Sequence, residues 1–126
     1  MELVEILFNN NDYENNVTRH TYSKEEEILI IDLYRRLDRR GITKNNPLII
    51  ILCAELNRHG YDCTTGGIAA KMSNLLSVDP EYTSEGKAGW ENIGSEFKSL
   101  WEHYYQNDFR DLYQDVIDAW KTVNSR

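Results

Sequence analysis

The 126-residue sequence has little of what marks several large classes of protein. It contains two prolines, seven glycines and two cysteines, while 40% of its residues are hydrophobic and 11% are aromatic. This balance excludes a linker or a disordered tail and predicts one folded domain spanning residues 1–126. The two cysteines, Cys53 and Cys63, are too few for a disulfide framework, so we expect free thiols in a reducing cytoplasm.

The sequence also lacks long apolar runs and the residue groupings that carry known chemistry. MELVEILF at the start has neither the positive region nor the cleavage site of a signal peptide, and no stretch reaches the roughly 18–20 apolar residues of a membrane span. We therefore expect a cytoplasmic protein that does not enter the membrane. The three histidines lie in different predicted elements, and neither HExxH nor a Cys-His set at zinc spacing occurs. We accordingly predict no enzymatic activity, no metal and no cofactor.

Charge is distributed unevenly along the chain. The net charge is −7, which argues against non-specific binding to a phosphate backbone. Between Arg35 and Val78, however, seven basic residues face three acidic ones, so this window carries +4 and the remainder of the chain carries −11. The sequence thus predicts a dipolar molecule with a cationic middle between acidic ends.

Apolar residues at three- and four-residue spacing predict a mainly α fold, a single-domain bundle of about five helices. A capping box of Ser23 and Glu26 begins the first helix, which is expected to reach Arg40 with Gly41 as its stop. Residues 23–78 should hold three helices, 79–94 an ordered loop pinned by Trp90 and Ile93, and 95–124 two helices, the second capped by Asn107. In residues 1–22, LVEILF and VTRHTY flank a turn-rich stretch, which predicts a short β-hairpin or an arm.

The second and third predicted helices form a helix-turn-helix-like pair. The second starts at Asn46-Pro47 and ends at Gly60, and its run LIIIL predicts a central helix, although composition also fits a buried strand. The third is capped by Thr64 or Thr65 and ends at Asp79-Pro80. Short turns between helices also occur in bundles that bind no nucleic acid. The third helix is therefore either a nucleic-acid reader or one more core helix.

A nucleic-acid surface on this pair would use the cationic middle. Clustered arginines suit phosphate contacts, although cations at a helix end also suit the helix dipole. Two glycines at the start of the third helix would expose backbone N–H groups to a phosphate, while Lys and Asn side chains on its polar side suit phosphate, guanine or adenine. The candidate residues are Arg35, Arg36, Arg39, Arg40, Lys44, Gly66, Gly67, Lys71 and Asn74.

Four stretches between residues 22 and 105 resemble one known family: YSKEEEILIIDLYRRL, NPLIIILCAELN, GGIAAKMSNLLSVDPEYTSEGKAG and EFKSLWEHYY. Together they are similar to the helical region that precedes the nuclease module in HNH-type endonucleases and related phage or restriction proteins. The resemblance implies a DNA-associated module, with Lys71, Asn74 and the Gly66-Gly67 entry on or near its binding surface and the four arginines as phosphate contacts. No nuclease module is present in the sequence, so the resemblance implies no nuclease activity.

Two functions fit these observations. The first is a small acidic phage or mobile-element protein that binds a host nuclease, such as a CRISPR or restriction enzyme, in its positively charged channel and inhibits or modulates it. Its binding surface would be the acidic faces of the last two helices, formed by Glu102, Asp108, Asp111, Asp115 and Asp118. The alternative is an accessory or regulatory protein that contacts nucleic acid through the cationic middle. Solvent-facing tyrosines among Tyr104, Tyr105 and Tyr113 would add a homodimer seam.

Overall fold

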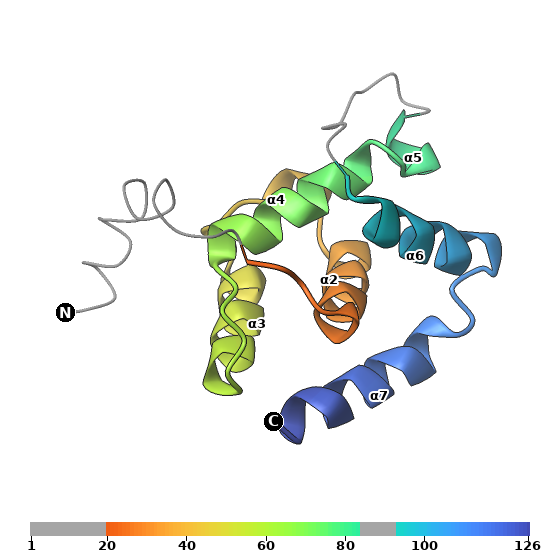
Figure 1. Ribbon diagram of the computed structural model, residues 1–126. Helices are drawn as coiled ribbons and strands as arrows, with labels where there is room; N and C mark the ends of the chain where they lie inside the picture. Colours follow the sequence, from red (N-terminus) through yellow and green to blue (C-terminus); the bar gives the residue numbers. More distant parts are fainter. Residues whose placement is uncertain (1–19, 84–92) are drawn as a thin grey trace.

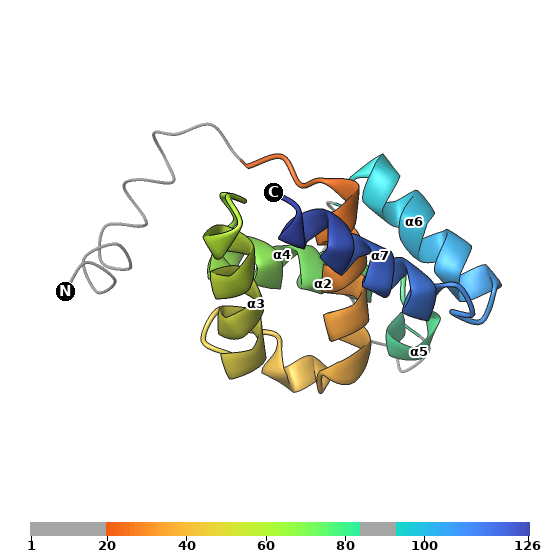
Figure 2. The ribbon, with the colours of Figure 1, turned by 90° about the horizontal axis from the view of Figure 1, so that it is seen from below.

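Helix α2 (Lys24–Arg36) is the element around which the others pack. The computed structural model describes residues 20–83 and 93–126 and shows α2 between two groups of helices, with α3 and α4 on one side and α6 and α7 on the other (Figures 1 and 2). After α2 the chain forms η1 (Arg39–Gly41), α3 (Pro47–Arg58), α4 (Thr65–Leu76), α5 (Pro80–Thr83), α6 (Ser95–Gln106) and α7 (Leu112–Asn124). No strand occurs in the described residues, and the prediction of a mainly α bundle is confirmed.

The start of α2 follows from its capping box. The Ser23 side chain accepts a hydrogen bond from the Glu26 backbone N–H, and the Glu26 carboxylate accepts one from the Ser23 backbone N–H at 2.8 Å. Isoleucines and leucines at four successive positions, 28–31, are all buried, because neighbouring helices cover α2 on more than one side. A helix that is apolar on several faces belongs in the interior of a bundle.

Helix α2 ends earlier than the sequence suggests. We predicted that it would continue to Arg40, but it stops at Arg36, and Leu37 and Asp38 adopt extended backbone angles. The Asp38 carboxylate then accepts a hydrogen bond from the Arg40 backbone N–H at 2.9 Å, which begins the 3-10 turn η1. Aspartate side chains that bond to nearby backbone N–H groups compete with helix continuation, and this competition accounts for the break.

Helix α3 lies at the edge of the bundle, so the prediction of a central helix is wrong, as is the strand alternative. Its start is as predicted, with Asn46 as the cap and Pro47 in the first turn, and the chain leaves it through Gly60 at a φ of 92°. Ile49 and Leu52 are buried against the core, but Ile51 is 62% exposed. The apolar run LIIIL therefore wraps around the whole helix, and only part of it meets the rest of the protein.

Helix α4 and the segment after it agree with the prediction in part. Thr64 caps α4, which ends before Asp79-Pro80. The region predicted as a loop begins with the short helix α5, whose first turn is held by a hydrogen bond from the Glu81 backbone N–H to the Asp79 carboxylate. Ile93 packs against the core. Trp90 and the predicted N-terminal hairpin or arm, apart from residues 20–22, lie outside the described residues.

The last helix begins later than predicted. Asn107 ends α6 instead of starting α7, and Asp108 and Phe109 have φ values of 53° and 57°. The Phe109 backbone N–H bonds to the Tyr104 carbonyl at 2.7 Å and that of Asp108 to the Tyr105 carbonyl at 3.2 Å, the paired bonds of a Schellman motif. Phe109 then packs against Trp101, with ring centroids 5.4 Å apart. This closure separates α6 from α7, whereas the apolar spacing alone predicted that the second helix would begin at Asn107, almost directly after the first.

A buried carboxylate ties the end of α2 to the α4–α5 connection. Asp79 is 3% exposed and accepts hydrogen bonds from the Tyr34 hydroxyl at 2.6 Å and from the Arg39 guanidinium at 2.9 Å. Burial, together with the bond to Asp79, raises the pKa of Tyr34 above its usual range, so the phenol remains a donor at neutral pH. Because buried charges require a partner, Arg39 is a structural residue of this fold.

Loss of Arg39, the cationic partner of Asp79, should destabilise the protein. We expect Arg39→Leu to lower the free energy of unfolding by about 1–3 kcal/mol, because Asp79 would remain buried without its cation. The matched control is Arg36→Leu, which removes an exposed pair with Asp32 and should change the value by less than about 1 kcal/mol. Urea denaturation followed by circular dichroism measures both. Equal losses in the two variants would contradict the assignment of Arg39 to the core.

Candidate binding surfaces

The four predicted phosphate-binding arginines are engaged with groups of the same chain. Arg35 lies over the Phe109 ring, with its guanidinium carbon 3.8 Å from the centroid. Arg36 pairs with Asp32 at 2.7 Å, and Arg40 pairs with Asp38 at 3.0 Å. The fourth, Arg39, bonds to both Asp79 and Glu81. Three of these arginines thus have carboxylate partners, and the other lies against an aromatic ring.

The carboxylates that pair with these arginines explain why the cationic middle has less unpaired positive charge in the folded protein than the charge count along the sequence suggests. Asp32 precedes the Arg35–Val78 window, and Asp79 and Glu81 follow it, so a count within the window omits them. The Arg39 hydrogen bonds to Asp79, Tyr34 and Glu81 raise its pKa, so the guanidinium stays charged at neutral and alkaline pH. Lys44, by contrast, is exposed and has no ion pair with any residue that the structure describes.

Lys71 is packed inside the bundle instead of facing solvent. Its ammonium lies 2.9 Å from the Glu27 carboxylate and over the rings of Phe97 and Tyr22, at 4.2 and 4.7 Å from their centroids. The lysine side chain is 19% exposed, and the Glu27 side chain is 11% exposed. Cation–π contacts and a shielded ion pair make Lys71 a link between α4, α2 and α6.

Helix α4, the candidate nucleic-acid reader, has no exposed residue: each of its twelve is buried or half-buried. Its side chains contribute Ile68, Met72 and Leu75 to the core. Asn74 is half-buried, and its backbone carbonyl accepts a hydrogen bond from the Ser77 hydroxyl. A recognition helix must offer one face to a groove. Of the two interpretations of this helix, the arrangement favours one more core helix.

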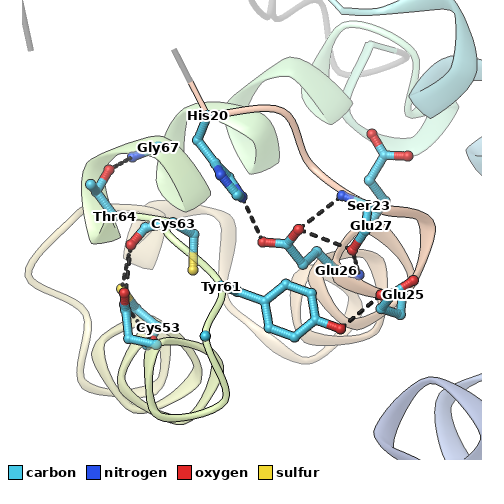
Figure 3. Close-up of polar contacts among 12 residues, drawn as sticks. His20, Ser23, Glu25, Glu26, Glu27, Cys53, Tyr61, Cys63, Thr64 and Gly67 are labelled. Carbon is cyan, nitrogen blue, oxygen red and sulfur yellow. Dashed lines mark hydrogen bonds and ion pairs between the residues drawn. The ribbon is translucent and has the colours of Figure 1, made fainter. Parts of the chain in front are cut away.

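The two glycines at the start of α4 have different surroundings. The Gly67 backbone N–H donates to the Thr64 hydroxyl at 2.9 Å, the capping bond drawn in Figure 3. A Cβ at Gly67 would overlap the Tyr22 hydroxyl and lie 3.0 Å from the Thr64 hydroxyl oxygen, whereas a Cβ at Gly66 would meet no atom within 4 Å. Gly67 therefore permits the close approach of Tyr22, and its N–H group is occupied by the cap.

Alanine substitutions at Gly66 and Gly67 distinguish a glycine that is needed for tight packing from one that leaves an open anion site. We expect Gly66→Ala to stabilise the protein by up to about 1 kcal/mol, because alanine favours a helix and the site has room. Gly67→Ala should destabilise it by about 1 kcal/mol through overpacking against Tyr22. In a Tyr22→Phe background the Gly67→Ala cost should fall, since the overlapping hydroxyl is gone. Thermal denaturation of the double-mutant cycle tests this, and equal effects of both alanines would disprove the packing role.

The predicted acidic residues fall into two groups. Glu102, Asp108, Asp111 and Asp118 are exposed and have no Arg or Lys partner among the described residues. Glu102 lies on α6, Asp118 on α7 and the other two in the connection between these helices, and we call the four together the α6–α7 acidic surface. Within it, Asp111 lies 3.7 Å from a His103 nitrogen, and Asp118 accepts a hydrogen bond from Gln114 at 3.1 Å. The fifth residue, Asp115, is half-buried and accepts a hydrogen bond from the Tyr104 hydroxyl at 2.7 Å. Asp115 therefore joins α6 to α7 and is not part of the surface.

Tyrosines near the α6–α7 acidic surface also differ in exposure. Tyr113 is 78% exposed and Tyr105 is 40% exposed, whereas Tyr104 is 1% exposed. Burial and the hydrogen bond to Asp115 raise the pKa of Tyr104. Tyr104 therefore cannot be part of the predicted homodimer seam, because its ring is buried in the core. Tyr105 and Tyr113 remain available for contact with another molecule.

Sequence patterns missed a cluster of buried and half-buried polar groups at the start of α2 (Figure 3). His20 lies 2.8 Å from the Glu26 carboxylate, and the Tyr61 hydroxyl donates to Glu25 at 2.7 Å. Close by, the Cys53 thiol donates to the Cys63 carbonyl at 3.5 Å, and the contact with Cys53 together with burial raises the pKa of Cys63. The capping box identified Glu26, but no local signal pointed to its histidine partner.

The described residues do not bring together a recognisable catalytic or metal-binding set. A surface depression of about 590 Å³ between the start of α2 and α6 is open to solvent, and no hydrogen bond joins its Ser99 to its His103. Its lining consists of Lys24, Glu27, Ser95, Glu96, Ser99, Leu100 and His103. No three His, Cys, Asp or Glu side chains in residues 20–83 and 93–126 group as metal ligands.

Comparisons with known proteins add no family to these observations. The chain matches no protein-family model, no curated protein and no solved structure. Among the helices of the described residues, none combines the length and the apolar character needed to cross a bilayer.

Proposed function

We propose that this chain is a non-enzymatic binding protein whose α6–α7 acidic surface docks on a basic surface of another protein. The observation that carries the proposal is the contrast between its two charged regions. The arginines of the middle segment are held by carboxylates or a ring of the same chain, whereas the four carboxylates of the α6–α7 acidic surface have no Arg or Lys partner in the described residues. Unsatisfied negative charge thus remains for a partner.

The position of the tyrosines supports a protein as the partner. Tyr105 on α6 and Tyr113 on α7 are exposed, and Glu102 and Asp118 lie on the same two helices. Exposed tyrosines beside charged residues are typical of protein interfaces, where the ring supplies buried area and the hydroxyl a hydrogen bond. Carboxylates at the edge of such an interface speed association with a basic partner and select against acidic ones.

A nuclease is the partner class that we propose. Its nucleic-acid channel is lined by basic residues, and a small acidic protein that occupies the channel competes with nucleic acid for it. The resemblance of residues 22–105 to a region of HNH-type endonucleases and related phage or restriction proteins supports this setting and remains a prediction. We therefore propose a phage or mobile-element protein that inhibits or modulates a host CRISPR or restriction nuclease.

The proposal predicts weak binding to DNA. Fluorescence anisotropy of a labelled duplex should give no binding tighter than the non-specific range at about 50 mM salt, and little further loss at about 200 mM. The physical reason is that Arg36, Arg39 and Arg40 already neutralise carboxylates of the chain. Affinity that falls by about a thousandfold or more over this salt range would instead support the nucleic-acid alternative.

Charge reversal on the proposed surface should weaken a protein complex. A tagged chain is used to capture a nuclease from host extract, and the purified pair is measured by surface plasmon resonance. We expect Glu102→Lys combined with Asp118→Lys to reduce the affinity about tenfold or more, mainly through slower association. The matched control, Asp62→Lys combined with Glu96→Lys, makes the same change of charge at two other exposed acidic positions.

The control pair distinguishes a specific surface from the total charge of the protein. A loss confined to the Glu102 and Asp118 pair supports the proposal. Equal losses in both pairs would mean that net charge alone governs binding, and unchanged affinity in both would remove the electrostatic basis of the proposal.

A further inference from the structure

Cys53 and Cys63, the only two cysteines of the sequence, lie next to each other in the folded protein. Cys53 is on α3 and Cys63 directly precedes Thr64, the cap of α4, so the turn through Gly60 brings the two cysteines together (Figure 3). Both residues are buried, at 7% and 3% exposure, and both are free thiols. The proposed function uses neither of them.

The Asn57 side chain holds the two cysteines close to each other. Its amide nitrogen lies 2.8 Å from the Cys53 carbonyl oxygen, 3.1 Å from the Cys63 carbonyl oxygen and 3.1 Å from the Cys53 sulfur. The Cys53 sulfur is itself 3.5 Å from the Cys63 carbonyl oxygen, and the two thiols are within hydrogen-bonding reach of each other. Rotation of the two side chains can bring sulfurs at contact distance to the roughly 2 Å of an S–S bond.

The two thiols differ in reactivity. The hydrogen bond from the Cys63 thiol lowers the pKa of Cys53, and the Asn57 amide acts in the same direction. The contact with Cys53, together with burial, raises the pKa of Cys63. Because the thiolate is the form that attacks an oxidant, Cys53 is the residue that reacts first. Cys63 is the adjacent thiol that can resolve the product.

We propose that Cys53 and Cys63 are a redox-sensitive pair that hydrogen peroxide converts to an intramolecular disulfide. The Cys53 thiolate attacks one peroxide oxygen and becomes a sulfenic acid, while the O–O bond breaks and the other oxygen leaves as hydroxide, which takes up the thiol proton. The Cys63 sulfur then attacks the Cys53 sulfur, the S–OH bond breaks, and water leaves with the Cys63 proton. Two thiols thereby lose two electrons, and the peroxide is reduced to two waters.

Burial of the pair favours a small oxidant, and the product should be more resistant to unfolding. A residue that is 7% exposed is accessible to a molecule the size of hydrogen peroxide but not to a bulky disulfide. The new bond closes a ring that contains the end of α3 and the turn to α4. Because such a ring restricts the unfolded chain, the oxidised protein should unfold at a higher urea concentration than the reduced protein.

Mass spectrometry of the full chain tests the proposal directly. The folded protein is treated with hydrogen peroxide, the remaining thiols are alkylated, and the chain is digested with trypsin, which cleaves after Arg58, between the two cysteines. We expect the peptides that contain Cys53 and Cys63 to be joined, with the loss of two hydrogen atoms and no added oxygen. Dithiothreitol should separate them again. The oxidised protein should run as a single chain on a non-reducing gel.

Serine variants identify the residue that attacks the peroxide. In Cys63→Ser, oxidation should stop at the sulfenic acid of Cys53, which dimedone traps. In the matched variant Cys53→Ser, Cys63 should remain a thiol under the same conditions. Circular dichroism spectra that match the parent establish that both variants are folded. Equal trapping in the two variants would contradict the order of reaction that we propose.

The measurement on the unsubstituted protein can overturn the proposal without any variant. Peptides that carry added oxygen but are not joined, or that are joined only between two chains, would contradict it. So would thiols that survive in the folded protein when the urea-unfolded protein loses them under the same treatment. None of these outcomes depends on the α6–α7 acidic surface, so the proposed function is tested separately.

Discussion

The fold depends on buried or shielded carboxylates that each hold a cation or hydrogen-bond donor from another segment of the chain. Asp79 receives Tyr34 and Arg39, Glu26 receives His20, and Glu27 receives Lys71. Three carboxylates would be costly in a core without these donors. Through these pairs Tyr34 and Arg39 join α2 and η1 to the α4–α5 connection, and Lys71 joins α4 to α2.

These internal pairs also determine which charges remain for function. The arginines near the end of α2 look in the sequence like a basic cluster, yet Asp32, Asp38 and Asp79 neutralise three of them. The exposed carboxylates of the α6–α7 acidic surface have no ion pair with an Arg or Lys among the described residues, and Asp115 is used by Tyr104. The surface is therefore predominantly acidic, as the net charge of −7 suggests, and the cationic middle adds little unpaired positive charge to it. Binding to a basic protein follows from this distribution more directly than binding to DNA does.

Local signals in the sequence predicted the fold well. The capping box at Ser23, the Asn46-Pro47 start and the Thr64 cap each describe a bond within one turn, so a short window contains all the required information. Helix ends set by side chains farther along were missed. Asp38 broke α2, and the Schellman closure at Asp108 delayed α7, because in each case the competing bond was not part of the apolar pattern.

The candidate sites were predicted less well, because they depend on contacts between distant residues. Lys71 seemed available until the structure placed it against Glu27, 44 residues away. Likewise, the apolar run of α3 gave no sign that only one face would meet the core. Exposure and charge pairing are properties of the packed molecule, so a linear count of Arg35 to Val78 could not supply them.

The most direct test of the internal pairing is an NMR spectrum of the arginine guanidinium groups. Arg39, bonded to Asp79 and Glu81, should give separate, slowly exchanging Nη signals because its rotation is restricted. Arg40, whose side chain is 92% exposed, should give one averaged signal. If Arg39 averages in the same way as Arg40, the bonds to Asp79 and Glu81 do not restrict its guanidinium, and the claim that a buried carboxylate holds Arg39 in the fold is wrong.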